Sequence, residues 1–168
     1  MARQLILFRH GKSDWEASCE LDHQRPLAKR GIKAAKVMGK LLSAAGQVPD
    51  AVLTSSALRA RSTVELAAQA GSWTCPIRST DSLYAAEPKQ VLSEIQQEPD
   101  TTQTLLLAGH EPTWSMLTAL LIGGGQVRFP TAALARIDFE VNAWQQVAFG
   151  QGYLIWLLLP KLFLDRKI

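Results

Sequence analysis

Polar residues stand at three points where a short apolar run of this chain ends, and their types suit chemistry on a phosphate group. Arg9 and His10 directly follow the first apolar run, Arg59 comes shortly after the second, and His110 follows a later one. A guanidinium group binds two phosphate oxygens at once, and a neutral imidazole can act as a nucleophile or a base. We therefore expect these four residues to form a site for phosphoryl transfer.

The apolar runs have the length and composition of buried strands, and a helical pattern follows each of them. The runs at 5–8, 51–54 and 104–108 predict these strands. In 27–45 an apolar stripe lies opposite four lysines, which predicts a helix that ends at Gly46. We also expect helices at 57–70, at 88–97 and from about residue 112, where Met116, Leu117, Leu120 and Leu121 point inward, and strands at 75–78 and within 133–160, including a buried one at 153–159.

This alternation of strands and helices predicts a single α/β domain over residues 1–168, a three-layer α/β/α sandwich with a mostly parallel central sheet. The carboxyl ends of parallel strands lie at one edge of a sheet, where open α/β sheets bind ligands. Helices that begin at this edge add backbone N–H donors and a partial positive charge. The expected topology thus brings Arg9, His10, Arg59 and His110 together.

Each of these residues also has an ordinary structural explanation when it is taken alone. His110 could be a core histidine with satisfied hydrogen bonds, and Arg59 could be a solvated residue on a helix. Their joint placement at strand ends is harder to explain in this way, because neighbouring arginines repel each other and a buried unpaired cation costs on the order of several kcal/mol. A dianionic phosphate would offset that repulsion.

Composition limits the partners and the compartment. The 168 residues are 47% hydrophobic and 20% charged, and the net charge of +3 is a mild excess that favours an anionic substrate. We expect no nucleic-acid partner, because no basic run is interleaved with aromatic residues. We expect no membrane partner either, because no segment reaches roughly 18 consecutive apolar residues. The two cysteines lack metal or disulfide spacing, so the cytoplasm, or an organelle stroma after removal of a targeting segment, is the expected location.

Three segments of the chain resemble motifs of the histidine phosphatase superfamily, which includes phosphoglycerate mutases and acid phosphatases. They are Phe-Arg-His-Gly-Lys-Ser-Asp-Trp at 8–15, Ser-Ser-Ala-Leu-Arg-Ala-Arg-Ser-Thr at 55–63 and Gly-His-Glu-Pro at 109–112. Arg-Pro-Leu at 25–27 and Thr-Ala-Ala-Leu-Ala at 131–135 are similar to the small SixA-type phosphohistidine phosphatases. The resemblance spans nearly the whole chain, and it implies a phosphoglycerate mutase-like fold.

The resemblance also implies roles for the candidate residues. His10 would be the nucleophile that becomes transiently phosphorylated, Arg9 and Arg59 would bind the phosphoryl oxygens, and His110 would add a further hydrogen bond. Arg25 would extend the phosphate pocket, although it can equally be an arginine on a loop surface. The arginines would take the part of magnesium, so no metal and no cofactor are expected.

The substrate prediction rests on where the chain departs from the mutases. The resemblance places a glutamate proton donor near Tyr84 and Glu87, but we favour packing and surface roles for these two residues. Without a strong acid, release of an alcohol is handicapped, whereas a phosphohistidine nitrogen can arrive protonated. We expect a phosphatase for phosphohistidine in proteins or for a phosphoramidate, with a phosphorylated protein or a small phosphorylated molecule as substrate and inorganic phosphate as product.

Two alternatives remain open. The chain could be a small-molecule phosphomonoesterase, in which Tyr84 or Glu87 donates the proton. It could also be a non-catalytic phosphate-binding or interaction module that keeps the pocket but has lost turnover. A helix face with Lys29, Lys33, Lys36 and Lys40 could dock an acidic partner domain, but we favour a solvated face as its explanation.

Overall fold

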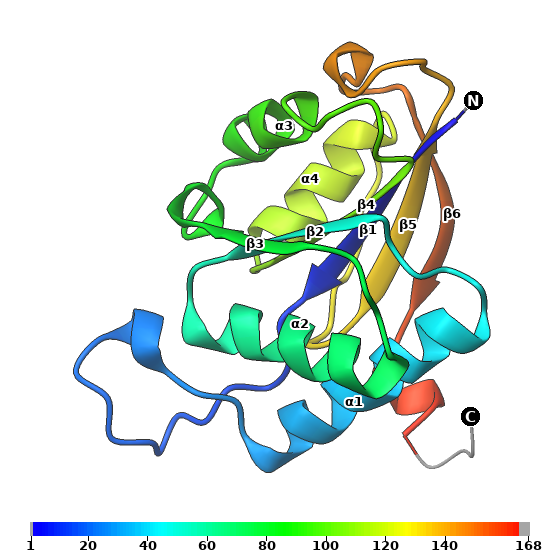
Figure 1. Ribbon diagram of the computed structural model, residues 1–168. Coiled ribbons are helices and arrows are strands. Elements are labelled where there is room, and N and C mark those ends of the chain that lie inside the picture. Colours follow the sequence, from blue (N-terminus) through cyan, green and yellow to red (C-terminus); the bar gives the residue numbers. More distant parts are fainter. Residues whose placement is uncertain (1, 165–168) are drawn as a thin grey trace.

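The computed structural model describes residues 2–164, which form a central sheet with helices on both faces (Figure 1). No helix in this range is long and apolar enough to cross a membrane. The strands are β1 (Arg3–Arg9), β2 (Ala51–Ser55), β3 (Ile77–Thr80), β4 (Thr104–Gly109), β5 (Leu134–Phe139) and β6 (Gly152–Leu158), and the helices are α1 (Lys29–Ala44), α2 (Leu58–Gly71), α3 (Pro88–Gln96) and α4 (Thr113–Leu121), with short 3-10 helices η1 (Asp22–Gln24), η2 (Asp81–Leu83), η3 (Trp144–Gln146) and η4 (Pro160–Leu162).

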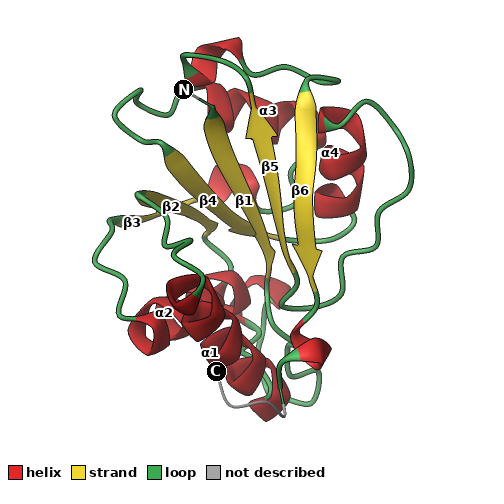
Figure 2. Cartoon of the chain, turned by 90° about the vertical axis from the view of Figure 1, so that its right-hand side faces the viewer, coloured by secondary structure: helices red, strands yellow, loops and turns green. Residues whose placement is uncertain are grey.

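The strand order in the sheet is β3-β2-β4-β1-β5-β6. Pairs β1/β4, β2/β4 and β2/β3 are parallel, whereas β1/β5 and β5/β6 are antiparallel. Helices α1 and α2 cover one face, and α3 and α4 cover the other (Figures 1 and 2). The predicted α/β/α architecture is confirmed. The antiparallel strands β5 and β6 lie together on one side of the sheet. The predicted site residues lie at the ends of the parallel strands β1, β2 and β4, or just after them.

The central strand β1 is buried on both faces because helices cover both. Its residues Leu5 and Leu7 pack in the cluster that includes α3 and α4, and Ile6 and Phe8 pack in the cluster that includes α1 and α2. This alternation follows from the two-residue period of a strand. All four side chains are fully buried, which explains why the sequence reads as a continuous apolar run.

Two predictions about individual elements were wrong, and the bounds of a third element differ from those expected. The expected buried strand at 153–159 is the edge strand β6, in which Tyr153 and Ile155 are 57% and 50% exposed. In α4, Met116 and Leu120 are exposed, and the inward positions belong to Trp114, Leu117, Thr118 and Leu121. The strand expected at 75–78 starts and ends two residues later, as β3. Apolar content alone does not tell which face of an element is covered.

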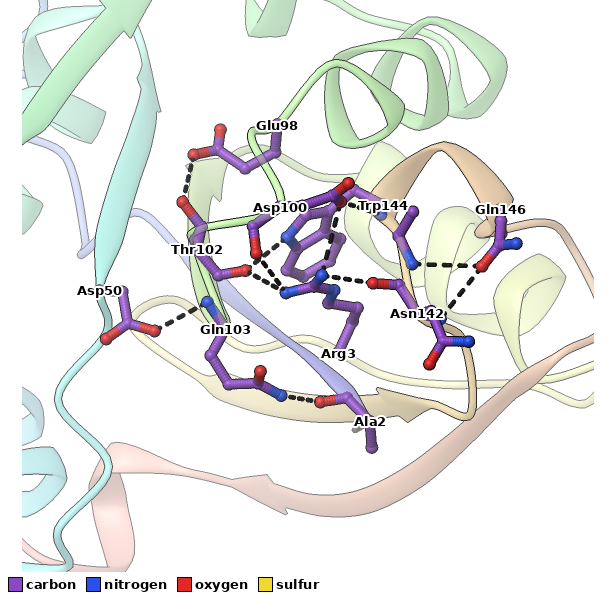
Figure 3. A network of polar contacts seen from close by, with 11 residues as sticks. Ala2, Arg3, Asp50, Glu98, Asp100, Thr102, Gln103, Asn142, Trp144 and Gln146 are labelled. Atoms are coloured by element: carbon purple, nitrogen blue, oxygen red, sulfur yellow. Dashed lines mark hydrogen bonds and ion pairs between the residues drawn. The ribbon is translucent and has the colours of Figure 1, made fainter.

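A polar network fixes the amino-terminal end of β1, at the opposite end from the predicted site (Figure 3). The Arg3 guanidinium is buried and donates to the carbonyl oxygens of Asp100 and Thr102 at 2.8 and 2.9 Å, and also to that of Asn142. The indole N–H of Trp144 donates to the Thr102 carbonyl at 2.8 Å. These contacts tie β1 to the connections before β4 and after β5, so that the sheet is held at the end where no ligand is expected.

Candidate active site

The register of β1 and β4 places the two candidate histidines side by side. Arg9 lies opposite Gly109 in this parallel pair, so the residues that follow them, His10 and His110, leave the sheet at the same point. Their ring centroids are 5.2 Å apart with an interplanar angle of 54°. Both residues are 8% exposed. The sheet therefore delivers two largely buried imidazoles to one spot.

The hydrogen bond of His10 determines which of its nitrogens can react. Its Nδ1 lies 2.7 Å from the carbonyl oxygen of Gly11. A carbonyl oxygen can only accept, so Nδ1 carries the proton and Nε2 keeps its lone pair. Burial lowers the pKa of His10 from 6.5 to about 4, the Gly11 carbonyl opposes this shift, and Arg59, Arg9 and Arg25 add to it. At neutral pH His10 is a neutral imidazole with a free Nε2, which is the form a nucleophile needs.

The turn after His10 is held by close backbone packing. A Cβ atom on Gly11 would stand 2.8 Å from the Gly31 carbonyl oxygen, and one on Gly31 would stand 2.3 Å from the Lys12 carbonyl oxygen. The Gly11 N–H donates to the Thr63 hydroxyl at 2.9 Å, and this hydroxyl donates to the Arg59 carbonyl at 2.6 Å. The turn is thus fixed between the start of α1 and the first turns of α2.

Asp22 joins the two arginines that approach His10 from other elements. Arg59, the second residue of α2, donates to the Asp22 carbonyl oxygen at 2.8 Å and to its carboxylate at 3.1 Å. Arg25 donates to the other carboxylate oxygen. Burial alone would raise the pKa of Asp22, but Arg59, the hydroxyl of Tyr84 and Arg25 outweigh it and lower the pKa. Asp22 is therefore a carboxylate that balances part of the positive charge of both arginines.

The connection between β1 and α1 brings Arg25 into the site because its two ends pair with each other. An isolated antiparallel bridge joins Ser13 and Leu27, and the Asp14 N–H donates to the Pro26 carbonyl at 2.8 Å. The Arg25 guanidinium carbon lies 3.2 Å from the ring centroid of Trp15, which is 73% exposed. Arg25 itself is 7% exposed. Arg25 therefore lines the cavity beside His10 and is not exposed on the surface of the loop.

His110 is oriented by β2. Its Nε2 lies 2.8 Å from the hydroxyl oxygen of Ser55, a fully buried residue at the end of that strand. When Ser55 donates this hydrogen bond, the proton of His110 is on Nδ1, which has no partner among the described residues. Burial lowers the pKa of His110 to about 3, with His10 and Arg59 adding to the shift and Asp22 opposing it. His110 is therefore neutral, and in this tautomer its Nδ1–H is a donor without a partner among the described residues.

The remaining arginine, Arg9, donates to the Phe129 carbonyl oxygen at 2.6 Å. Burial lowers the pKa of Arg9, and the nearby Glu111 opposes this shift. A cavity of about 220 Å³ lies among these groups, and several buried donors around it have no hydrogen-bond partner among residues 2–164. These donors are Nε of Arg9, Arg25 and Arg59 and Nη1 of Arg25. The cavity is lined by Arg9, His10, Lys12, Ser13, Trp15, Arg25, Arg59, His110, Glu111 and Thr131.

This arrangement suits a phosphoryl group. Cations and unpartnered donors surround a small cavity beside a neutral nucleophile, and a tetrahedral anion would satisfy both the charges and the hydrogen bonds. Glu111 is the acidic residue in the lining, and both of its carboxylate oxygens accept hydrogen bonds from Ser115. Among residues 2–164, no group of three or more His, Cys, Asp and Glu side chains is arranged to hold a metal ion.

The two candidate acids lie beside a second cavity of about 350 Å³, which shares Arg59, His110 and Glu111 with the first. Tyr84 donates its hydroxyl proton to Asp22 at 3.1 Å, and its ring meets His110 edge-on with centroids 5.8 Å apart. Glu87 is exposed at the start of α3. Tyr84 is therefore within the site's hydrogen-bond network, whereas Glu87 is at its rim.

The structure brings together all five predicted site residues, Arg9, His10, Arg25, Arg59 and His110. The structure adds two residues that were not predicted, Asp22, which contacts Arg59, and Ser55, which contacts His110. The sequence offered a signal for Ser55, because this residue follows a predicted strand directly. It offered no signal for Asp22, which lies in a polar connection and is 37 residues away from Arg59.

Comparisons with known proteins agree with a site for phosphoryl transfer. The family model described as histidine phosphatase superfamily (branch 1) matches residues 5–87. An uncharacterized protein of Mycobacterium tuberculosis is 37% identical over 163 residues, which cover 91% of this chain and 99% of the relative. An uncharacterized chloroplastic protein of Arabidopsis thaliana is 30% identical over 178 residues, which cover all of this chain and 81% of the relative.

Two solved structures are similar over nearly their whole length. A protein assigned as phosphohistidine phosphatase SixA from Nakamurella multipartitia has a TM-score of 0.82 and 27% identity, covering 95% of this chain and 97% of that one. A protein with the same assignment from Agrobacterium tumefaciens has a TM-score of 0.79 and 29% identity, covering 94% and 98% of the two chains.

Proposed function

The chain belongs to the histidine phosphatase superfamily and is of the SixA type, and we propose that it is a phosphatase that removes the phosphoryl group of phosphohistidine in proteins by way of a phosphorylated His10. The observation that carries this proposal is the free Nε2 of a neutral, buried His10, surrounded by arginine donors that have no partner.

In the first step, the lone pair of His10 Nε2 attacks the phosphorus atom of the substrate. A P–N bond forms on His10 while the P–N bond of the substrate breaks, and that electron pair stays on the departing imidazole nitrogen. The carbonyl of Gly11 holds Nδ1–H and stabilises the positive charge that develops on the phosphorylated ring. In the second step, water attacks the phosphorus and the P–N bond to His10 breaks, with its electron pair returning to Nε2. His10 is restored as a neutral imidazole that keeps its Nδ1 proton, and both protons of the water leave on the released dihydrogen phosphate.

The other site residues contribute by position and charge. Phosphoryl transfer passes through a loose transition state with charge spread over three oxygens. Arg9, Arg25 and Arg59 neutralise that charge, and Nε of all three, together with Nη1 of Arg25, has no other hydrogen-bond partner among residues 2–164. His110 supplies a further donor from Nδ1, oriented by Ser55. Because these groups are fixed before the substrate arrives, little reorganisation is needed.

The site favours a leaving group that needs little protonation. Both oxygens of Glu111 are engaged by Ser115, and Tyr84 already donates its proton to Asp22. Glu87 is exposed. An alkoxide is a poor leaving group and needs an acid placed next to it. A phosphohistidine whose second nitrogen is protonated leaves as neutral imidazole, so this substrate class supports the proposal.

A substrate panel tests the proposed function. Hydrolysis of a phosphohistidine peptide, of phosphoramidate and of a phosphomonoester is measured by phosphate release, with and without a chelator. We expect rapid release from the two P–N substrates, slow release from the monoester and no effect of the chelator. The variant His10→Ala should form no phosphoenzyme and release no phosphate. Rapid release from the monoester with phosphohistidine untouched would overturn the substrate assignment.

A small-molecule phosphomonoesterase is the second candidate, because Glu87 lies beside the cavity that adjoins the phosphate site. In that case Glu87→Gln should lower monoester hydrolysis at least tenfold, and most strongly for poor alcohol leaving groups. The matched variant Glu94→Gln changes a carboxylate on the same helix that does not line this cavity. Under our proposal, both variants hydrolyse phosphohistidine at the unaltered rate.

We also propose that the protein works in the cytoplasm. Cys19 is exposed and Cys75 is half-buried, and both thiols are free. Free thiols of this kind persist in a reducing compartment.

A further inference from the structure

A further hollow, distinct from the cavity beside Tyr84 and Glu87, adjoins the phosphate site, and its charged residues have no role in the mechanism described above. We call it the basic groove; it has a volume of about 420 Å³ and is bordered by the cations Lys12, Arg30 and Lys161. It shares Lys12 and Thr131 with the phosphate cavity. A molecule with its phosphoryl group on His10 can therefore extend into the basic groove without leaving the protein surface.

Three separate elements build the basic groove. Lys12 belongs to the turn after β1, Arg30 to the first turn of α1, and Lys161 to η4, which packs against α1 near the end of the described chain (Figures 1 and 2). The floor between them is apolar and includes the buried Ala34 and Pro160. Residues from both ends of the fold thus meet in one concave surface.

The positive charge of the basic groove is not balanced by ion pairs within the described residues, 2–164. Lys12, Arg30 and Lys161 are exposed, and none of the three forms an ion pair within residues 2–164. Among residues 2–164, no acidic side chain lines the groove. By contrast, most arginines elsewhere have a carboxylate partner, as Arg3, Arg25, Arg59, Arg78 and Arg136 do. Three like charges around one hollow favour an anionic occupant.

We propose that the basic groove binds an acidic segment of the substrate protein, next to the phosphohistidine that enters the phosphate cavity. This inference rests on the proposed function and specifies the class of its substrate. Carboxylates of the segment would pair with Arg30 and Lys161, and the carbon chains of its side chains would lie on the apolar floor. Lys12, at the junction of the two cavities, would contact the residue beside the phosphohistidine.

The shape and chemistry of the groove favour a polypeptide over a small anion. The phosphate cavity offers buried donors without partners, as tight binding of one anion requires. In the basic groove the cations are exposed and stand around a larger, apolar-floored space. Exposed charges of this kind contribute weakly one by one and act together on an extended partner with several carboxylates.

The test compares two chemically phosphorylated peptides that carry one phosphohistidine each. In the first, three glutamates stand on either side of the phosphohistidine, and in the second these are glutamines. The variant Arg30→Glu/Lys161→Glu reverses two charges in the groove. The matched control Lys36→Glu/Lys40→Glu reverses two exposed lysines of the same helix that do not line the groove, and it changes the net charge equally.

We expect the unaltered protein to hydrolyse the glutamate peptide with a kcat/KM about tenfold above that of the glutamine peptide. The groove variant should lose this preference through a higher KM, and the control should keep it within about twofold. All three proteins should hydrolyse phosphoramidate equally, because that substrate does not reach the groove. The preference should also weaken at high ionic strength.

The outcomes separate the two proposals. If the unaltered protein hydrolyses neither peptide, the proposed function fails and the inference fails with it. If it hydrolyses both peptides at equal rates, or if the groove variant and the control behave alike, the inference alone is overturned. If the groove variant loses phosphoramidate hydrolysis as well, Arg30 and Lys161 serve the phosphate cavity itself, and the inference is overturned in favour of that role.

Discussion

The low pKa of the nucleophile predicts how the stability of the protein depends on pH. Burial lowers the pKa of His10 from 6.5 to about 4 in the folded protein. Between these two pKa values the unfolded chain binds a proton that the folded protein does not bind. Stability from this group is therefore complete above pH 6.5 and is lost as the pH falls towards 4. At pH 5 the two protonation equilibria give a loss of about 2 kcal/mol relative to pH 7.5.

Urea unfolding of the unaltered protein and of His10→Gln, each at pH 7.5 and pH 5, measures this quantity. The variant cannot take up the proton, so its free energy of unfolding should fall less between the two pH values, by about 2 kcal/mol. Phosphate is left out of the buffers, because a bound anion would favour protonated His10. The dependence on urea concentration should be the same for both proteins, as expected if they unfold to the same extent.

Equal losses of stability in the two proteins would refute a buried neutral His10. His110→Gln is an independent repetition, because burial lowers the pKa of His110 to about 3. Its expected difference at pH 5 is again about 2 kcal/mol. Added phosphate should reduce the pH dependence of the unaltered protein, since a phosphate anion bound in the cavity offsets the charge of a protonated histidine.

Three substitutions test other parts of the site. Asp22→Asn removes the carboxylate between Arg25 and Arg59, so we expect the free energy of unfolding to fall by about 1 kcal/mol. Added phosphate should restore most of this loss. A melting temperature that is unchanged both with and without phosphate would contradict this role of Asp22. Arg59→Lys keeps the positive charge but removes the paired N–H donors of the guanidinium group. We expect kcat/KM to fall about 100-fold in phosphate-release assays. A change below threefold would argue against contact between Arg59 and the phosphoryl group. Gly31→Ala places a Cβ atom 2.3 Å from the Lys12 carbonyl oxygen, so it should lower the free energy of unfolding by about 1–3 kcal/mol and also lower turnover. A variant as stable as the unaltered protein would show that the turn can accommodate the extra carbon.

Strands and helices could be predicted from the sequence where an apolar run, or an apolar stripe with helical spacing, is long and clearly separated from the next one. The runs that became β1, β2 and β4 are covered on both faces and consist mainly of apolar residues. The same signal misled at β6, which is apolar but lies at the edge of the sheet with one side open. Edge and centre differ only in what packs against the strand, and that is decided by parts of the chain far away in sequence.

The site residues also divide into those that could be predicted from the sequence and those that could not. Arg9, His10, Arg59 and His110 could be grouped because each stands at the carboxyl end of a strand or at the start of the next helix. The contact of Asp22 with Arg59 could not be predicted, because it depends on how the connection between β1 and α1 folds back.

The sequence by itself determined which chemistry is available, because residue types and strand ends are local properties that place imidazoles and guanidiniums at one edge of the sheet. Only the tertiary structure decided their chemical state. The Gly11 carbonyl sets the reactive nitrogen of His10, and burial among arginines keeps it neutral. The contact with Gly11 joins neighbouring residues, whereas the lowered pKa depends on desolvation and on charges brought together from the whole chain, which no local pattern encodes.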